Sequence, residues 1–252
     1  MSDKTKSLST RPEKIFIYDA AIQRYGLLKA AIVGELYYWL AIEKKPFRRY
    51  QDHAVLFHVS RACAGYAHTS LTDKSNLFKR NQPRSKKHGG KLAYNYEIGS
   101  DEFCAELKDN YRSIIRNEKR KSDFGEFYAP DEPMFNLHAK THTILTDIID
   151  EFADLNKAYI YTRLCWFSYT AEVGSNHFSF NSIASLANLL GLNRTTLTRR
   201  LDELVELDCI EYEISDHHLS VLLHSDHQCY EIYQNWINGV NEKRTDGIQD
   251  LF

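Results

Sequence analysis

The sequence predicts a mainly α-helical protein with small β-hairpins, and residues 178–223 carry this prediction. Two helical patterns in this stretch are separated by Gly191 and followed by two runs of alternating apolar residues. In the second helical pattern Leu197, Leu201 and Leu204 recur at i, i+4 and i+7, so that helix should have one buried face. A chain of 252 residues that is 43% hydrophobic is also large enough to bury a core.

The turn between these two helices carries its own signals. Gly191 can take the left-handed conformation that ends a helix. Asn193 can cap the next helix, because its side chain accepts a hydrogen bond from a free backbone N–H. The alternating residues of 210–214 and 219–223 then predict two strands, with the hairpin turn at 216–218.

A helix, a tight turn, a second helix and a hairpin together resemble the winged helix-turn-helix family, and LANLLGLNRTTLTRRLDEL carries the resemblance. The resemblance implies binding to double-stranded DNA, with the second helix in the major groove. The expected contacts are the polar residues on its outer face: Arg194, Thr195, Thr198 and Arg199. A winged helix that contacts only other proteins is the alternative, because a fold alone does not fix a function.

A second, more divergent winged helix is expected in the first hundred residues. Its centre is Leu27–Glu43, a helix that is apolar on nearly every side. Ser60 can cap a short helix over 61–67. Thr69–Arg80 matches the later NRTTLTRR in register, which predicts a helix from Asp73 to Arg80 as the counterpart of the reading helix.

The middle of the chain is basic and its end is acidic. Residues 79–121 hold twelve Lys or Arg and six Asp or Glu, whereas residues 202–252 hold two and twelve. The expected phosphate contacts in the first half follow from this basic character: Lys74, Lys79, Arg80, Arg84, Lys86, Lys87 and Lys91. For the basic run from Lys79 to Lys91, a merely solvated flexible loop is the alternative. Glu211, Glu213 and Asp216 should keep the second wing off the DNA.

These patterns divide the chain into five expected segments. They are a flexible tail over 1–12, an N-terminal winged-helix-like domain over 13–100, a helical linker over 101–135, a C-terminal winged-helix domain with a terminal helix over 136–240, and a tail over 241–252. Helices are expected at Leu137–Phe152, Ala158–Ala171 and Cys229–Val240 within the second domain.

Two winged helices in one chain resemble plasmid replication initiators and phage replisome-organiser proteins. The lead-in YDAAIQRYGLLKAAIVGELYYWLAIEKK, with Tyr37, Tyr38, Trp39 and Leu40 near the end of its helix, carries this second resemblance. The resemblance implies site-specific DNA binding and recruitment of replication proteins. A transcriptional repressor, and an adaptor or inhibitor that acts through protein contacts, remain as alternatives. Whether the chain acts as a monomer or a homodimer is open.

The last residues, Ile248-Gln249-Asp250-Leu251-Phe252, are similar to the peptides with which bacterial replication proteins bind the sliding clamp. Asp250, Leu251 and Phe252 match the last three positions of that pattern, and Ile248 departs from its usual glutamine. The resemblance implies the sliding clamp as a partner. The alternative is that Leu251 and Phe252 fold back onto their own domain.

The sequence offers little support for catalysis or for a bound cofactor. It has no phosphate-binding glycine loop, no zinc-protease motif and no nucleophile elbow, so we expect neither an enzyme nor a cofactor. The pair His138 and His142 has no evident third ligand, and alternation would send His218 and His224 to different faces, so we expect no metal. Five scattered cysteines, no signal peptide and no long apolar run predict a cytoplasmic protein without a membrane span.

Overall fold

A computed structural model describes residues 12–41, 46–82, 93–123, 141–170, 176–215 and 218–249. The described chain is mainly helical with small antiparallel sheets, which confirms this part of the fold prediction. The first half contains β1 (Lys14–Tyr18), α1 (Asp19–Tyr25), α2 (Leu27–Ala41), β2 (Phe47–Arg48), α3 (Tyr50–Leu56), α4 (Arg61–Thr69), the π-helical turn η1 (Ser70–Lys74), β3 (Phe78–Asn81), β4 (Tyr94–Ile98) and α5 (Phe103–Asp123). The second half contains β5 (Thr141–Leu145), α7 (Thr146–Phe152), α8 (Leu155–Thr170), β6 (His177–Phe180), α9 (Ile183–Leu190), α10 (Arg194–Glu206), β7 (Ile210–Ser215), β8 (His218–Leu223) and α11 (Gln228–Gln249).

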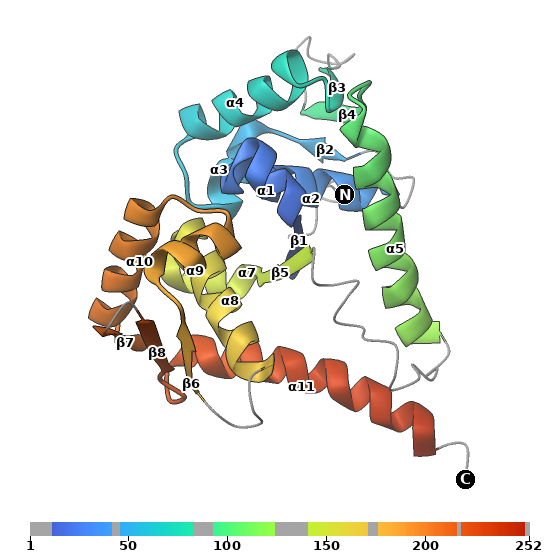
Figure 1. Ribbon diagram of the computed structural model, residues 1–252. Coiled ribbons are helices and arrows are strands. Elements are labelled where there is room, and N and C mark those ends of the chain that lie inside the picture. Colours follow the sequence, from blue (N-terminus) through green and yellow to red (C-terminus); the bar gives the residue numbers. More distant parts are fainter. Residues whose placement is uncertain are drawn as a thin grey trace, which may run out of the picture.

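The two halves repeat one order of elements. Each runs strand, two helices, strand, two helices, two strands and a long final helix. Each also forms a three-stranded antiparallel sheet in which the last strand is central, in the orders β2-β4-β3 and β6-β8-β7. In Figure 1 the first half lies above and the second half below, and they meet at β1 and β5.

Backbone conformation supports the same repeat. Within the described residues, positive φ angles occur at six positions, and these form three pairs at matching places. Gly26 and Ala153 follow α1 and α7, His58 and Gly191 lie in the turns before α4 and α10, and Asn76 and Asp208 precede β3 and β7. Left-handed residues are uncommon outside glycine and asparagine, so three coincidences indicate one backbone template used twice.

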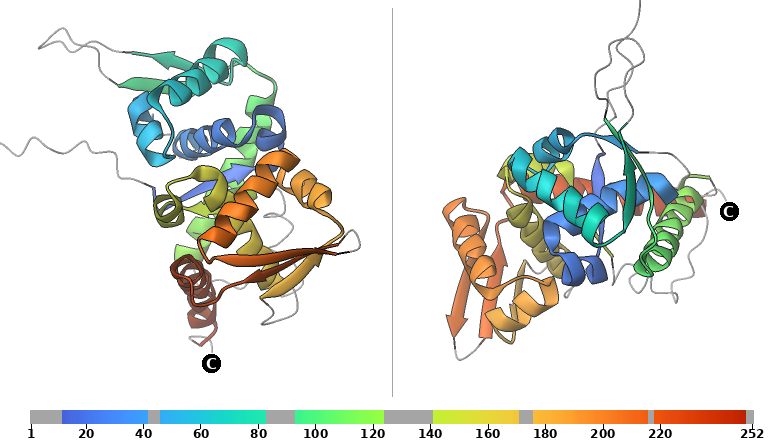
Figure 2. Two further views of the ribbon diagram at one scale, coloured as in Figure 1. Left: turned by 90° about the vertical axis from the view of Figure 1, so that its left-hand side faces the viewer. Right: turned by 90° about the horizontal axis from the view of Figure 1, so that it is seen from above.

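The seam between the halves is an antiparallel pair of equivalent strands. Lys14 of β1 lies opposite Leu145 of β5, and Tyr18 lies opposite Thr141, so the first residue of each strand meets the last residue of the other. A two-fold axis through the central pair, Phe16 and Thr143, produces this register. The hairpins agree, because β3–β4 and β7–β8 point in opposite directions in the left view of Figure 2.

Equivalent contacts cross the seam near the two tight turns. His58 Nε2 lies 2.9 Å from Asp150 Oδ1 on α7. On the other side Gly191 lies so close to α1 that an added Cβ would be 3.0 Å from Ile22 Cγ2. In each half, therefore, the turn before the outer helix (α4 or α10) packs on the first helix of the other half (α7 or α1). This arrangement ties the positions of α4 and α10 to the seam.

The long helix α5 covers the described part of the expected helical linker over 101–135, and it packs on the first half. Phe103, Leu107, Tyr111 and Ile114 are buried, and α5 packs along α2. The Tyr111 hydroxyl donates to the Phe16 carbonyl oxygen at 2.8 Å, which joins α5 to the seam strand. The amphipathic pattern of α5 reflects packing on its own half, as α11 packs on α7 and α8 in the second half.

Several predicted elements are wrong. Thr69–Arg80 does not form a reading helix, because α4 ends at Thr69, η1 follows, and Lys79 and Arg80 lie on β3. Leu137–Phe152 is not one helix, since 141–145 is the strand β5 that pairs with β1. The final helix α11 runs to Gln249, well past the expected end at Val240.

Other predicted elements are confirmed. The Ser60 cap, the Gly191 turn, the Asn193 cap and the strands β7 and β8 lie where the sequence placed them. No helix among the described residues is sufficiently long and apolar to cross a bilayer.

Candidate nucleic-acid interface

Helix α10 has a polar outer face, and its cap and its buried face hold it firmly in place. Asn193 Oδ1 accepts from the Thr195 backbone N–H at 2.8 Å, which caps the helix as predicted. Leu197, Leu201 and Leu204 are buried against the core. Ser182 and Ser185 form reciprocal hydrogen bonds of 3.0 Å at the start of α9, so the preceding helix is capped as well.

The residues predicted to read DNA lie on the outer face of α10. Arg194, Thr195 and Arg199 are exposed, and Thr198 is half-buried and donates to the Arg194 carbonyl oxygen at 3.0 Å. The Arg199 side chain is 64% exposed, with only a 3.8 Å contact from its Nε to Glu203 Oε1. A surface pair of this length holds a side chain weakly, so Arg199 can reorient toward a ligand.

Two other polar residues of α10, Arg200 and Asp202, make contacts within the protein instead. Arg200 pairs with Asp154 at 2.8 Å and with Glu203 at 2.5 Å, which ties α10 to the start of α8. The Tyr212 hydroxyl donates to Asp202 Oδ1 at 2.5 Å and fixes β7 against α10. The interface on α10 is therefore confined to the side away from these contacts.

Helix α4 is the structural counterpart of α10 in the first half. Both follow a left-handed turn residue and an N-cap, and Ser60 Oγ accepts from the Cys63 backbone N–H at 3.1 Å. Counted from the caps, the buried residues of α4, Ala64 and His68, match Leu197 and Leu201. In the left view of Figure 2, α4 (teal) lies above α10 (orange), and both face the viewer.

The exposed residues of α4 were not among those predicted. They are Arg61, Ala62, Cys63 and Tyr66, and the Tyr66 side chain is 78% exposed. The capping signal at Ser60 could have identified this helix as the counterpart. The apolar spacing could not, because its buried positions hold alanine and histidine instead of leucine.

The basic residues of the first half that were predicted to contact phosphates are not all equally exposed. Lys74 and Lys79 are exposed. Arg80 is half-buried, bonds to the Tyr50 hydroxyl and to Asp73 Oδ2, and lies over the Tyr94 ring at 5.4 Å, so it is a structural residue first. Arg84, Lys86, Lys87 and Lys91 lie outside the described residues, as do Asp250, Leu251 and Phe252.

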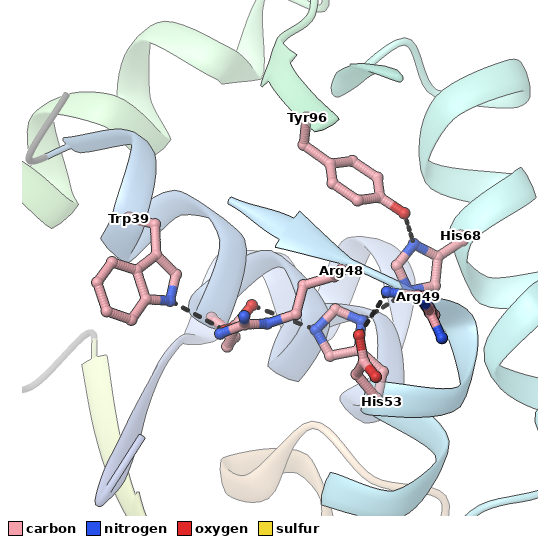
Figure 3. Close-up of polar contacts among 8 residues, drawn as sticks. Trp39, Arg48, Arg49, His53, His68 and Tyr96 are labelled. Carbon is pink, nitrogen blue, oxygen red and sulfur yellow. Dashed lines mark hydrogen bonds and ion pairs between the residues drawn. The ribbon is translucent and has the colours of Figure 1, made fainter. Parts of the chain in front are cut away.

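A buried polar chain lies directly behind α4 (Figure 3). The Glu35 carboxylate of α2 accepts from Arg48 Nε at 2.8 Å and from Trp39 Nε1 at 3.0 Å. Its other oxygen lies 3.2 Å from His53 Nε2. The chain continues from His53 Nδ1 to His68 Nε2 at 2.7 Å and from His68 Nδ1 to the Tyr96 hydroxyl at 2.7 Å. It thus joins α2, β2, α3, α4 and β4.

Protonation states follow from burial and from these partners. Burial alone raises the pKa of the Glu35 carboxyl, but hydrogen bonds and charge from His53 and Arg48 outweigh burial and leave that pKa below its ordinary value. Burial, helped by His53 and Arg80, lowers the pKa of His68 to about 2. Burial raises the pKa of Tyr96 far above its usual range.

The lowered pKa keeps the His68 imidazole neutral, so one of its ring nitrogens donates and the other accepts. The Glu35 carboxylate can only accept, so His53 Nε2–H is the donor in that contact. His68 therefore has a partner on each ring nitrogen, His53 on one side and Tyr96 on the other. Because Glu35, Arg48, His53, His68 and Tyr96 are each at most 5% exposed, and only Trp39 is half-buried, this chain acts by holding elements together.

No group of three or more His, Cys, Asp or Glu side chains in the described part of the chain could hold a metal ion. No protein-family model matches this chain, and no curated protein or solved structure matches it either.

Proposed function

We propose that this chain is a sequence-specific double-stranded DNA-binding protein with two winged helix-turn-helix modules. The observation that carries the proposal is the capped, well-packed helix α10 with Arg194, Thr195 and Arg199 exposed on one face. Arginine donates in pairs to guanine O6 and N7, and threonine hydroxyls contact base edges or phosphates, so this face suits a major groove.

The repeat supports a two-site form of binding. The repeated order of elements and the antiparallel pairing of β1 with β5 support an arrangement in which α4 and α10 act like the two recognition helices of a dimeric repressor. A single chain would then contact two successive major grooves, about 10 base pairs apart. Exposed Lys74 and Lys79 in the first half supply charge for phosphate contacts.

The biological role that we propose is replication of a plasmid or phage, as an initiator or replisome organiser. This part of the proposal rests on the sequence resemblance alone, and a transcriptional repressor would use the same interface. Binding assays with purified DNA do not distinguish the two roles. The position of the selected site relative to an origin or a promoter does.

The test is a selection of bound sequences from a random duplex pool with the full chain, followed by a mobility-shift assay over a salt series. A binder that neutralises phosphates loses affinity steeply as salt rises. No enrichment and no shift at low salt would overturn the proposal.

A second candidate, contact with proteins only, is favoured by the far side of the second half. On the β7–β8 hairpin, Leu222 is 37% exposed on the same face as the exposed acidic residues Glu211 and Glu213, and Ile214, on the opposite face near the end of β7, is 57% exposed. Apolar and acidic groups on a wing are poorly suited to phosphate. If the pool gives no enrichment while the hairpin variant Ile214→Ser abolishes a protein interaction, the second candidate replaces the first.

A further inference from the structure

The outer faces of α4 and α10 occupy equivalent positions but have different chemistry. Counted from their caps, Arg61 corresponds to Arg194, Ala62 to Thr195, and Tyr66 to Arg199. On α10 these positions offer two guanidinium groups and a hydroxyl. On α4 they offer one guanidinium group, a methyl group and an aromatic ring.

These groups favour different bases in a major groove. A guanidinium group at the position of Arg199 pairs with guanine, whereas apolar side chains contact the 5-methyl group of thymine. Tyr66 and Ala62 lie one turn apart on the exposed side of α4 and would form one apolar surface. The Tyr66 hydroxyl at the tip of an exposed ring has room to donate to a base or a phosphate.

A protein ligand would be the usual occupant of an exposed aromatic patch, but the surroundings of α4 favour DNA. Arg61 lies at the start of the same exposed face, and Lys74 and Lys79 are exposed in the same half. The helix also shares a side of the molecule with α10 (Figure 2). We expect a duplex that is bound to α10 and centred on the seam to meet α4 with its next groove.

We propose that α4 is a second reading helix, specific for thymine methyl groups through Tyr66 and Ala62. The target is then an inverted pair of unlike half-sites, with guanine under α10 and thymine under α4. This inference rests on the proposed DNA binding and adds the chemistry of the second half-site.

The experiment uses the full chain and the sequence selected from the random pool. Thymines in the half-site assigned to α4 are replaced by deoxyuridine, which removes only the 5-methyl group. We expect affinity to fall about fourfold for each contacted methyl group, which corresponds to about 0.8 kcal/mol. The same replacement in the half-site of α10 should lower affinity less, because the exposed Thr195 offers a single methyl group there in place of an aromatic ring and a methyl group.

Two variants assign the effect to a helix. Tyr66→Ala, at an exposed position, should bind the parent site more weakly and lose sensitivity to deoxyuridine. Arg199→Ala should bind more weakly but keep that sensitivity. A selected sequence with one half-site, or equal deoxyuridine sensitivity in Tyr66→Ala and the parent, overturns the inference while DNA binding stands. No binding to any duplex overturns the proposed function, and the inference with it.

Discussion

Glu35→Gln tests whether the buried polar chain behind α4 stabilises the first half. Glu35 is 3% exposed, and its carboxylate accepts hydrogen bonds from Arg48, Trp39 and His53. Glutamine keeps the shape but removes the negative charge, so Arg48 at 5% exposure loses its counter-ion. Its amide nitrogen also cannot accept from His53.

The expected loss is about 3–5 kcal/mol of unfolding free energy, the range found when one partner of a buried ion pair is removed. The hydrogen bonds give a similar figure. Arg48 donates to Glu35 through Nε and through one terminal nitrogen, and a bond to a charged group contributes about 1.5–3 kcal/mol. Because the folded-state pKa of Glu35 is lowered, its contribution is complete above the unfolded value of 4.5 and is lost as pH falls below it.

The assay is urea unfolding at pH 7, followed by far-ultraviolet circular dichroism. The matched control is the double variant Glu35→Gln with Arg48→Met, which leaves no buried charge unpaired and should recover much of the loss. Hydrogen exchange should show the loss of protection in α4 and β4 and not in α10. A Glu35→Gln variant within about 1 kcal/mol of the parent, or a double variant no more stable than the single one, would refute the reasoning.

Three further predictions concern other parts of the molecule. Folded His68 stays neutral to about pH 2 while the unfolded side chain takes up a proton below 6.5, so stability should fall by up to about 1.4 kcal/mol per pH unit below 6.5 in urea titrations. His68→Leu should flatten that slope, and an unchanged slope would contradict this account. Arg199→Ala should weaken the selected DNA site by about 1–3 kcal/mol in mobility-shift assays and relax preference at one base, whereas equal affinity would exclude α10 as reader. Gly34→Ala should destabilise by about 1–3 kcal/mol or more, because its Cβ would overlap the Phe16 carbonyl oxygen. Gly239→Ala, with open space around it, should instead raise the free energy of unfolding by about 1 kcal/mol. Urea unfolding measures both glycine variants.

The stretch from α9 to β8 was predictable because its signals are local. Asn193, Gly191 and the leucines of α10 lie within the fourteen residues from Gly191 to Leu204 and act through caps, a left-handed turn and one buried stripe. The exposure of Arg194 and Arg199 followed from the same stripe. Nothing outside this stretch was needed to place the outer face of the helix.

The first half was harder because its core departs from that pattern. The buried positions of α3 and α4 hold His53, Ala64 and His68, so no apolar stripe marks the helices. The sequence of Thr69–Arg80 is more similar to that of α10 than is the sequence of α4, which is the structural counterpart of α10.

Strand β5, in the second half, was predicted as part of a helix. It forms by pairing with β1, more than a hundred residues earlier, and local periodicity gives no information about such a distant partner.

Comparison of the two halves shows that residues of the polar chain stand where the second half has apolar residues. Arg48, His53, His68 and Tyr96 occupy the places of Phe180, Leu186, Leu201 and Val221, judged from helix position and strand register.

An apolar core at these places generally gives equal or greater stability, so stability alone does not explain the polar chain. Hydrogen bonds differ from apolar contacts in having direction, and this chain of them fixes His68, and with it α4, relative to α2 and β4. If α4 reads DNA as proposed, its apolar outer face offers few hydrogen bonds to set its angle in a groove. The buried hydrogen bonds to His68 would then fix that angle from the core side of the helix.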